Sequence, residues 1–232
     1  MNPTDVFKLE KDGLESKLPN YEKNFAEKKP LTPITIQGIE YELLTPEYEN
    51  LMQILTETRT EIKELKKYTE DYQSDKYFGI GIENGSITKL QISKYELQKI
   101  PTIIGQLTNL QDLNLRGNQI STIPAELGQL NQLQNLYLSY NKISTIPTEI
   151  GQLTKIQYLD LTNNEIIEIP AEIGKLTQLK ELTLYNNKIS VIPAEIGKLT
   201  QLQNLNLGSN QIKVIPAELQ DLEIVKRGII RL

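Results

Sequence analysis

Glutamates recur at a fixed interval along the second half of the chain, and a row of carboxylates can serve acid–base catalysis or bind a metal ion. They lie 23 residues apart, at Glu126, Glu149, Glu172, Glu195 and Glu218. Each follows a proline by two residues, where a short helix is expected to begin. A carboxylate is favoured there by the positive end of the helix. This structural explanation is sufficient, so we assign no catalytic role to the row.

Two side chains on which catalysis often depends are missing from the sequence. The 232 residues include no His and no Cys, which excludes His-dependent bases and triads, thiolate nucleophiles and disulfides. Neither the P-loop pattern nor the G-x-G-x-x-G pattern occurs, which argues against a phosphate-binding loop. We therefore predict no catalytic residue, no metal site and no cofactor, and we do not expect an enzyme.

The 23-residue interval is the period of a whole repeated unit. It also separates the members of two further series, Asn118, Asn141, Asn164, Asn187 and Asn210, and Pro101, Pro124, Pro147, Pro170, Pro193 and Pro216. A period in this range indicates a solenoid, in which one supersecondary unit stacks on copies of itself.

One unit, residues 107–129, shows why these residue types recur. Leu113 and Leu115 alternate with polar residues, which predicts a short strand with its leucines on one face. Asn118 follows the strand, and its amide can bond the backbone of its own turn and of the adjacent repeat. Pro124 suits the first position of a short helix, and we expect Gly128 to end that helix in a left-handed conformation.

The unit L-x-x-L-x-L-x-x-N-x-I-x-x-I-P-x-E-I-G-x-L resembles the leucine-rich repeat, in its 23-residue, intracellular, bacterial-like type, over about residues 78–222. The resemblance implies an α/β fold: a leucine-rich-repeat solenoid, an arc with a parallel β-sheet on its concave face. We expect a small α/β capping region at its N-terminal end. Proteins of this type usually scaffold or regulate, which implies a partner polypeptide bound on the concave face.

We divide the chain at residues 76 and 222. Residues 1–76 are predicted to form an N-terminal arm with a hairpin near 34–43 and an amphipathic capping helix over about 45–75, capped by Thr45. Residues 77–222 are predicted to form the repeat domain, with an N-cap hairpin over 77–92 about Asn84-Gly85 and about six repeats. Residues 223–232 are expected to close the stack.

The predicted helix has one apolar stripe, and the stripe has two possible uses. Its members recur at spacings of three, four and seven: Tyr48, Leu51, Met52, Leu55, Ile62 and Leu65. Packing on the chain itself is the favoured use. Because the spacing also resembles a heptad seam, a structural protein that oligomerises through this helix is the alternative function. We expect a monomer rather than an oligomer.

Charge and hydropathy restrict the partners. Residues 1–76 carry 16 Asp/Glu and 11 Lys/Arg, net charge −5, whereas the rest of the chain carries 14 of each. Without a basic stripe, nucleic acid is not an expected partner. We see neither a membrane span nor a secretory signal, so a cytoplasmic location is the expectation, with export by another route left open.

Side chains on the inner wall of the predicted arc differ from repeat to repeat, and aromatic residues gather in its centre. We predict that Tyr137, Tyr158 and Tyr185 form one aromatic patch. The predicted partner-binding residues are Arg116, Tyr137, Tyr140, Tyr158, Asp160, Glu181 and Tyr185. Tyr and Arg are enriched in binding hot spots. The alternative is that Tyr simply suits strands and that these rings contact only water. The sequence does not identify the partner.

Overall fold

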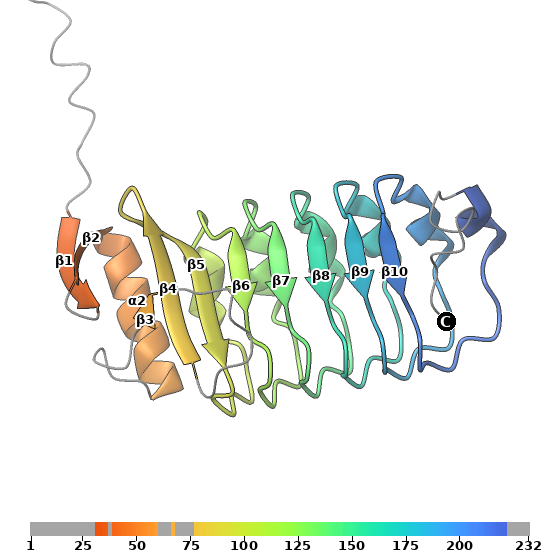
Figure 1. The fold of residues 1–232 in the computed structure, drawn as a ribbon, viewed down its shortest axis with the longest axis horizontal. Coiled ribbons are helices and arrows are strands. Elements are labelled where there is room, and N and C mark those ends of the chain that lie inside the picture. Colours follow the sequence, from red (N-terminus) through yellow and green to blue (C-terminus); the bar gives the residue numbers. More distant parts are fainter. Residues whose placement is uncertain (1–30, 37–38, 60–65, 68–76, 222–232) are drawn as a thin grey trace, which may run out of the picture. The chain divides into compact units, whose positions relative to one another are not determined.

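The computed structural model describes residues 31–36, 39–59, 66–67 and 77–221, and these described residues belong to one compact unit. Ten strands and one α-helix lie within them (Figure 1). The first elements are β1 (Leu31–Ile36), β2 (Ile39–Leu44), α2 (Thr45–Thr58), β3 (Lys66–Lys67), β4 (Tyr77–Glu83) and β5 (Ser86–Ser93). The short strands of the repeats are β6 (Asp112–Asn114), β7 (Asn135–Tyr137), β8 (Tyr158–Asp160), β9 (Glu181–Thr183) and β10 (Asn204–Asn206).

Eight of the described strands form one sheet, in the order β10-β9-β8-β7-β6-β5-β4-β3. From β5 to β10 the strands are parallel, and each residue pairs with the residue 23 positions later, as Leu113 does with Leu136. The α/β solenoid with a parallel sheet that the sequence predicted is therefore confirmed.

Each repeat returns through a five-residue 3-10 turn, and these turns lie behind the strands in Figure 1. The turns are η3 (Thr102–Gln106), η4 (Ala125–Gln129), η5 (Thr148–Gln152), η6 (Ala171–Lys175), η7 (Ala194–Lys198) and η8 (Ala217–Asp221). The glutamate of the repeat lies in the first turn from η4 to η8, as expected for a helix start. From η3 to η7 the proline precedes the turn as its N-cap rather than occupying its first position.

The core lies between the strands and the 3-10 turns. Leucines and isoleucines at repeating positions are completely buried there, such as Leu159, Leu161 and Ile166. Each such burial contributes roughly 1.5–3 kcal/mol. Because each repeat buries its face against its neighbours, the core is continuous along the stack.

The asparagines of the series are used in hydrogen bonding, and all but the half-buried Asn210 are buried. In the central repeat, Asn164 Oδ1 accepts from the N–H of Ile143 at 3.0 Å, and Nδ2 donates to the carbonyls of Leu138 and Leu161 at 3.0 Å each. One side chain thus joins its own turn to the preceding repeat, as predicted. The asparagines at the other repeats make equivalent bonds.

Gly128 does not adopt the left-handed conformation that the sequence suggested, because only Gly85 and Gly117 among the described glycines have a positive φ. Its role is close packing. A Cβ placed on Gly128 would lie 2.8 Å from the backbone carbonyl oxygen of Glu149 in the next turn. The glycine therefore allows neighbouring 3-10 turns to approach.

The N-terminal end of the stack is covered by the elements that precede it. Antiparallel β4 and β5 form the predicted hairpin about Asn84-Gly85, and β1 and β2 form the second one. Helix α2 buries Leu51, Ile54 and Leu55 in the common core. Because its apolar stripe is used within the chain, the described part of α2 offers no heptad seam to a partner.

The helix is shorter than predicted. It ends before Arg59, whose φ of 54° is left-handed, and residues 66–67 form strand β3, parallel to β4. The edge of β4 is thereby paired, and Lys66 Nζ lies 5.2 Å from the centroid of the Tyr77 ring, whose pKa is raised by burial. Thr45 is the first helical residue and not the cap, which is Leu44.

Several predictions fall on other parts of the chain. Ile62, Leu65, most of the N-terminal arm and the closing cap at 223–232 lie outside the described residues. The division of the chain at residues 76 and 222 stays a proposal.

Asn164→Ala is expected to lower the free energy of unfolding by about 2–4 kcal/mol. The substitution leaves the Ile143 N–H and two carbonyls without their partner where water has little access. Denaturant unfolding followed by circular dichroism measures the loss. The matched control is Lys155→Ala on the exposed surface, which we expect to change stability by less than about 0.5 kcal/mol. Equal effects of the two substitutions would contradict the role given to the asparagine.

Lys188→Met is expected to raise the pKa of Glu165. Lys188 Nζ lies 2.7 Å from Glu165 Oε2, and this hydrogen bond, then the charge of Lys188, holds the pKa below its ordinary value. Because the pKa of Glu165 is lower in the folded state than in the unfolded state, the pair stabilises the fold fully at pH values above the unfolded-state pKa. This stabilisation is lost as the pH falls through the folded-state pKa. NMR titration of the carboxyl carbon measures the pKa, and an unchanged value would refute the assignment.

Candidate partner-binding face

The strands of the repeats present one residue to the core and two to the other side of the sheet. The central leucine of each strand is completely buried, as in Leu136 and Leu159, and its two neighbours point away from the core. We call the surface formed by these neighbours the polar face. Its members on the repeat strands are Asp112, Asn114, Asn135, Tyr137, Tyr158, Asp160, Glu181, Thr183, Asn204 and Asn206.

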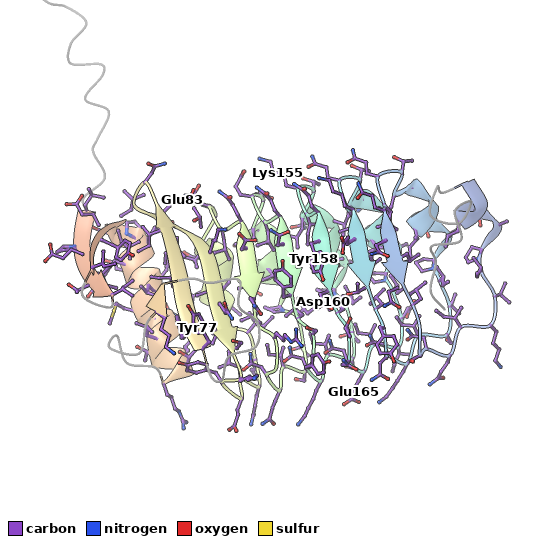
Figure 2. The ribbon with its side chains drawn as sticks, viewed as in Figure 1. Tyr77, Glu83, Lys155, Tyr158, Asp160 and Glu165 are labelled. Carbon is purple, nitrogen blue, oxygen red and sulfur yellow. The ribbon has the colours of Figure 1, made fainter. Side chains whose placement is uncertain are left out.

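Two of the predicted tyrosines are in contact. The rings of Tyr137 and Tyr158 have centroids 4.9 Å apart and planes inclined by 38°. They are diagonal neighbours, because Tyr137 pairs with Asp160 and Tyr158 with Asn135. Both side chains are half-buried. Figure 2 shows Tyr158 and Asp160 over the middle strands, whereas Lys155 and Glu165 lie at the two margins of the repeat.

Tyr185 lies apart from this pair. It follows β9 by two residues, and its ring covers Gly208, where an added Cβ would lie 3.2 Å from Tyr185 Cδ2. No ring contact between Tyr185 and either other tyrosine occurs among the described residues. Tyr185 is 42% exposed, so it adds a separate aromatic surface one repeat further along.

Tyr140 and Arg116 form a second aromatic contact, outside the strands. Arg116 Cζ lies 4.7 Å from the centroid of the Tyr140 ring. Tyr140, one of the predicted partner-binding residues, has a φ of 57° and lies in the turn before Asn141, beyond the end of strand β7. Gly117 and Asn163 occupy the equivalent positions of adjacent repeats with positive φ. Because Gly and Asn favour that conformation, their recurrence was the signal that this position is a turn.

Two acidic residues lie beside the tyrosine pair, Asp160 on the same strand as Tyr158 and Glu181 on the next strand. Asp160 Oδ1 accepts from the Thr162 N–H at 3.0 Å and from the Thr183 hydroxyl at 2.8 Å, which holds the carboxylate in place. Glu181 pairs with Tyr158 in the sheet. On the other side of the pair, Lys89 Nζ lies 3.2 Å from Asp112 and is neutralised by it.

The polar face is hollowed near its N-terminal end. A cavity of about 440 Å³ is lined by Gln91, Ser93, Lys94, Asn114, Arg116, Gly117 and Tyr140. Gln91, Ser93 and Asn114 are buried although they lie on the polar side of the sheet. Their neighbours Lys94, Arg116 and Tyr140 are longer and line the same cavity. No signal in the sequence indicated the cavity, because it depends on how side chains of adjacent repeats lie together.

The structure offers no assembled metal site in the parts of the chain that it describes. The glutamates of the 3-10 turns lie on a different side of the stack from the polar face, one per repeat. Among the described helices, none is long and apolar enough to cross a membrane.

A double-mutant cycle with Tyr137→Ala and Tyr158→Ala is expected to give a coupling energy of about 0.5–1.5 kcal/mol. Either single substitution already removes the contact between the two rings, so the second substitution costs less than it does in the wild type. Denaturant unfolding of the wild type, both single variants and the double variant measures it. The control cycle combines Tyr137→Ala with Tyr185→Ala and is expected to give additive effects. Additive effects in the first cycle would show that the ring contact does not stabilise the fold.

Comparison with known proteins places these features in a family. A profile described as "Leucine-rich repeat region" matches residues 127–227, and a profile described as "Leucine rich repeat" matches residues 85–143. A search of curated proteins found no match.

Solved structures similar to the chain include plant receptor ectodomains. The ectodomain of the membrane receptor kinase GASSHO1/SCHENGEN3 from Arabidopsis thaliana, in complex with CASPARIAN STRIP INTEGRITY FACTOR 2, is 33% identical with a TM-score of 0.56, over 62% of this chain and 17% of that one. The plant peptide hormone receptor RGFR1, in complex with RGF2, is 40% identical with a TM-score of 0.50, over 53% of this chain and 20% of that one.

A third similar structure is of more comparable length. The BIR3–SERK2 complex from Arabidopsis thaliana includes a chain that is 29% identical with a TM-score of 0.51, over 60% of this chain and 77% of that one. The first two matches cover only about a fifth of the receptor chains. The repeated strands, the buried asparagines and the two matching profiles together establish that the chain belongs to the leucine-rich repeat proteins.

Proposed function

We propose that the repeats form a non-enzymatic protein-binding module that holds a partner polypeptide on the polar face, which is the concave side of the predicted arc, with a scaffold or regulatory role. The observation that carries this proposal is the Tyr137–Tyr158 contact at the centre of that face. Large rings held against each other are presented with little loss of side-chain entropy, as binding hot spots require.

The similar structures support a protein partner in general terms. Two of the three were solved with a bound peptide or factor, and the third is a complex of two proteins. Leucine-rich repeat proteins of this kind are mostly interaction modules. The absence of His and Cys from the sequence favours a non-enzymatic role for this chain, and equal numbers of acidic and basic residues in 77–232 make nucleic acid an unfavoured partner.

The arrangement of charge supports binding by the same face. Arg116 precedes the tyrosine pair along the stack and Glu181 follows it, so the face has a basic and an acidic end. Oppositely charged groups on a partner would align it in one direction.

Assembly through the N-terminal helix is not favoured, because Leu51 and Leu55 are buried in the chain's own core. A monomeric state and a cytoplasmic location stay predictions, as does the bacterial-like type of the repeat.

Replacing Tyr158 and Tyr185 together by Ala is expected to reduce capture of the partner at least about tenfold, since hot-spot tyrosines each contribute more than about 1 kcal/mol. Partners captured from lysate by the wild-type chain are identified by mass spectrometry, purified and titrated by calorimetry. The control variant is Ile167→Ala with Val191→Ala, which removes two exposed apolar side chains outside the strands. Unchanged affinity of the tyrosine variant, with an unchanged circular dichroism spectrum, would refute binding at this face.

A further inference from the structure

The cavity at the N-terminal end of the polar face has a floor of buried amides. Its volume of about 440 Å³ lies within the range of small-ligand pockets, about 300–1,000 Å³. Gln91 on β5 and Asn114 on β6 are each 1% exposed and pair directly in the parallel sheet. Adjacent strands lie about 4.8 Å apart, so the two side chains are immediate neighbours.

Both amides have an unused hydrogen-bonding atom. Among the described residues, three buried side-chain atoms have no hydrogen-bond partner: Gln91 Oε1, Asn114 Nδ2 and Ser139 Oγ. The first two belong to residues that line the cavity. Asn114 Oδ1 accepts from the Arg116 N–H at 3.1 Å, which fixes the orientation of that amide and leaves Nδ2 as the unused donor. A buried donor and a buried acceptor thus lie side by side without partners, which is unusual in a folded protein.

The same cavity is lined by basic side chains. The Arg116 guanidinium is held against the Tyr140 ring at 4.7 Å, and it forms no ion pair with any residue that the structure describes. Lys94 lines the same cavity. The nearby Lys89 is already neutralised by Asp112. Arg116 therefore brings to the cavity a positive charge for which the described residues supply no anion, and Asn114 Nδ2 adds a hydrogen-bond donor.

We propose that this cavity binds an acidic residue, Asp or Glu, of the partner polypeptide. Its carboxylate lies against the Arg116 guanidinium. The unpaired atoms of Asn114 and Gln91 are buried beneath the cavity, and after a small shift of the two side chains Nδ2 donates to the carboxylate and Oε1 accepts from a peptide N–H of the bound segment. Charge-assisted bonds to a guanidinium are among the stronger polar contacts. The inference rests on the proposed function and adds the chemistry of the partner: an acidic group reaches the cavity, and the same segment continues over Tyr137 and Tyr158.

The test is an NMR titration of the full chain with two capped tripeptides, acetyl-Ala-Glu-Ala-amide and acetyl-Ala-Gln-Ala-amide. We expect the Glu peptide to shift the side-chain amide signals of Asn114 and Gln91 and to bind about tenfold more tightly than the Gln peptide. Arg116→Gln is expected to abolish that preference. Lys155→Gln removes the same charge from a lysine outside the cavity, where it donates to Gln132, and is expected to retain the preference.

Three results would overturn the proposal: equal binding of the two peptides, a preference that survives Arg116→Gln, or no shift of the two amides at about 10 mM peptide. Circular dichroism of Arg116→Gln ensures that a lost preference is not lost folding. If Tyr158 and Tyr185 prove necessary for capture while the peptides are not distinguished, the acidic-residue inference fails and the proposed function stands. If the peptides are distinguished while the tyrosines are dispensable, the cavity binds an acidic residue and the proposed capture of a partner by the tyrosines fails.

Discussion

The stack depends on hydrogen bonds for the backbone N–H and C=O groups that lie beyond the three-residue strands. The repeat strands are too short to pair most of the backbone in each 23-residue unit, and the chain turns into the core directly after them. Buried N–H and C=O groups without partners destabilise a fold strongly. The asparagine amide supplies one acceptor and two donors from a single short side chain, and Asn164 uses all three functions. A carboxylate lacks the donors, so the residue type is restricted.

Because the buried positions of every repeat must match their neighbours, variation is confined to the polar face. Leucine occupies the centre of every repeat strand, whereas its two neighbours change from repeat to repeat. Along the stack these residues form an ordered series: a basic cavity at Arg116, an aromatic pair at Tyr137 and Tyr158 with Asp160 beside it, then Glu181 on the next strand. The same scaffold constraint that makes the core uniform thus leaves one surface on which specificity can be built.

The end of the solenoid obeys a different constraint, since a first repeat would expose both its core and its sheet edge. Helix α2 covers the core with Leu51, Ile54 and Leu55, while β4 and β3 extend the sheet. Asn118 accepts from the N–H of Leu97, as the later asparagines do from the equivalent residue, and also from the N–H of Tyr95.

The sequence by itself determined the repeat, its register, the strand leucines, the asparagine bonding and the Asn84-Gly85 hairpin, because each depends on local periodicity or on a contact between equivalent positions 23 residues apart. Tertiary structure decided the rest. The close packing at Gly128, the end of α2 at Arg59 and the turn position of Tyr140 depend on the backbone of adjacent elements. The separation of Tyr185 from the tyrosine pair and the cavity over Gln91 and Asn114 depend on side-chain directions across repeats, which a one-dimensional pattern does not contain.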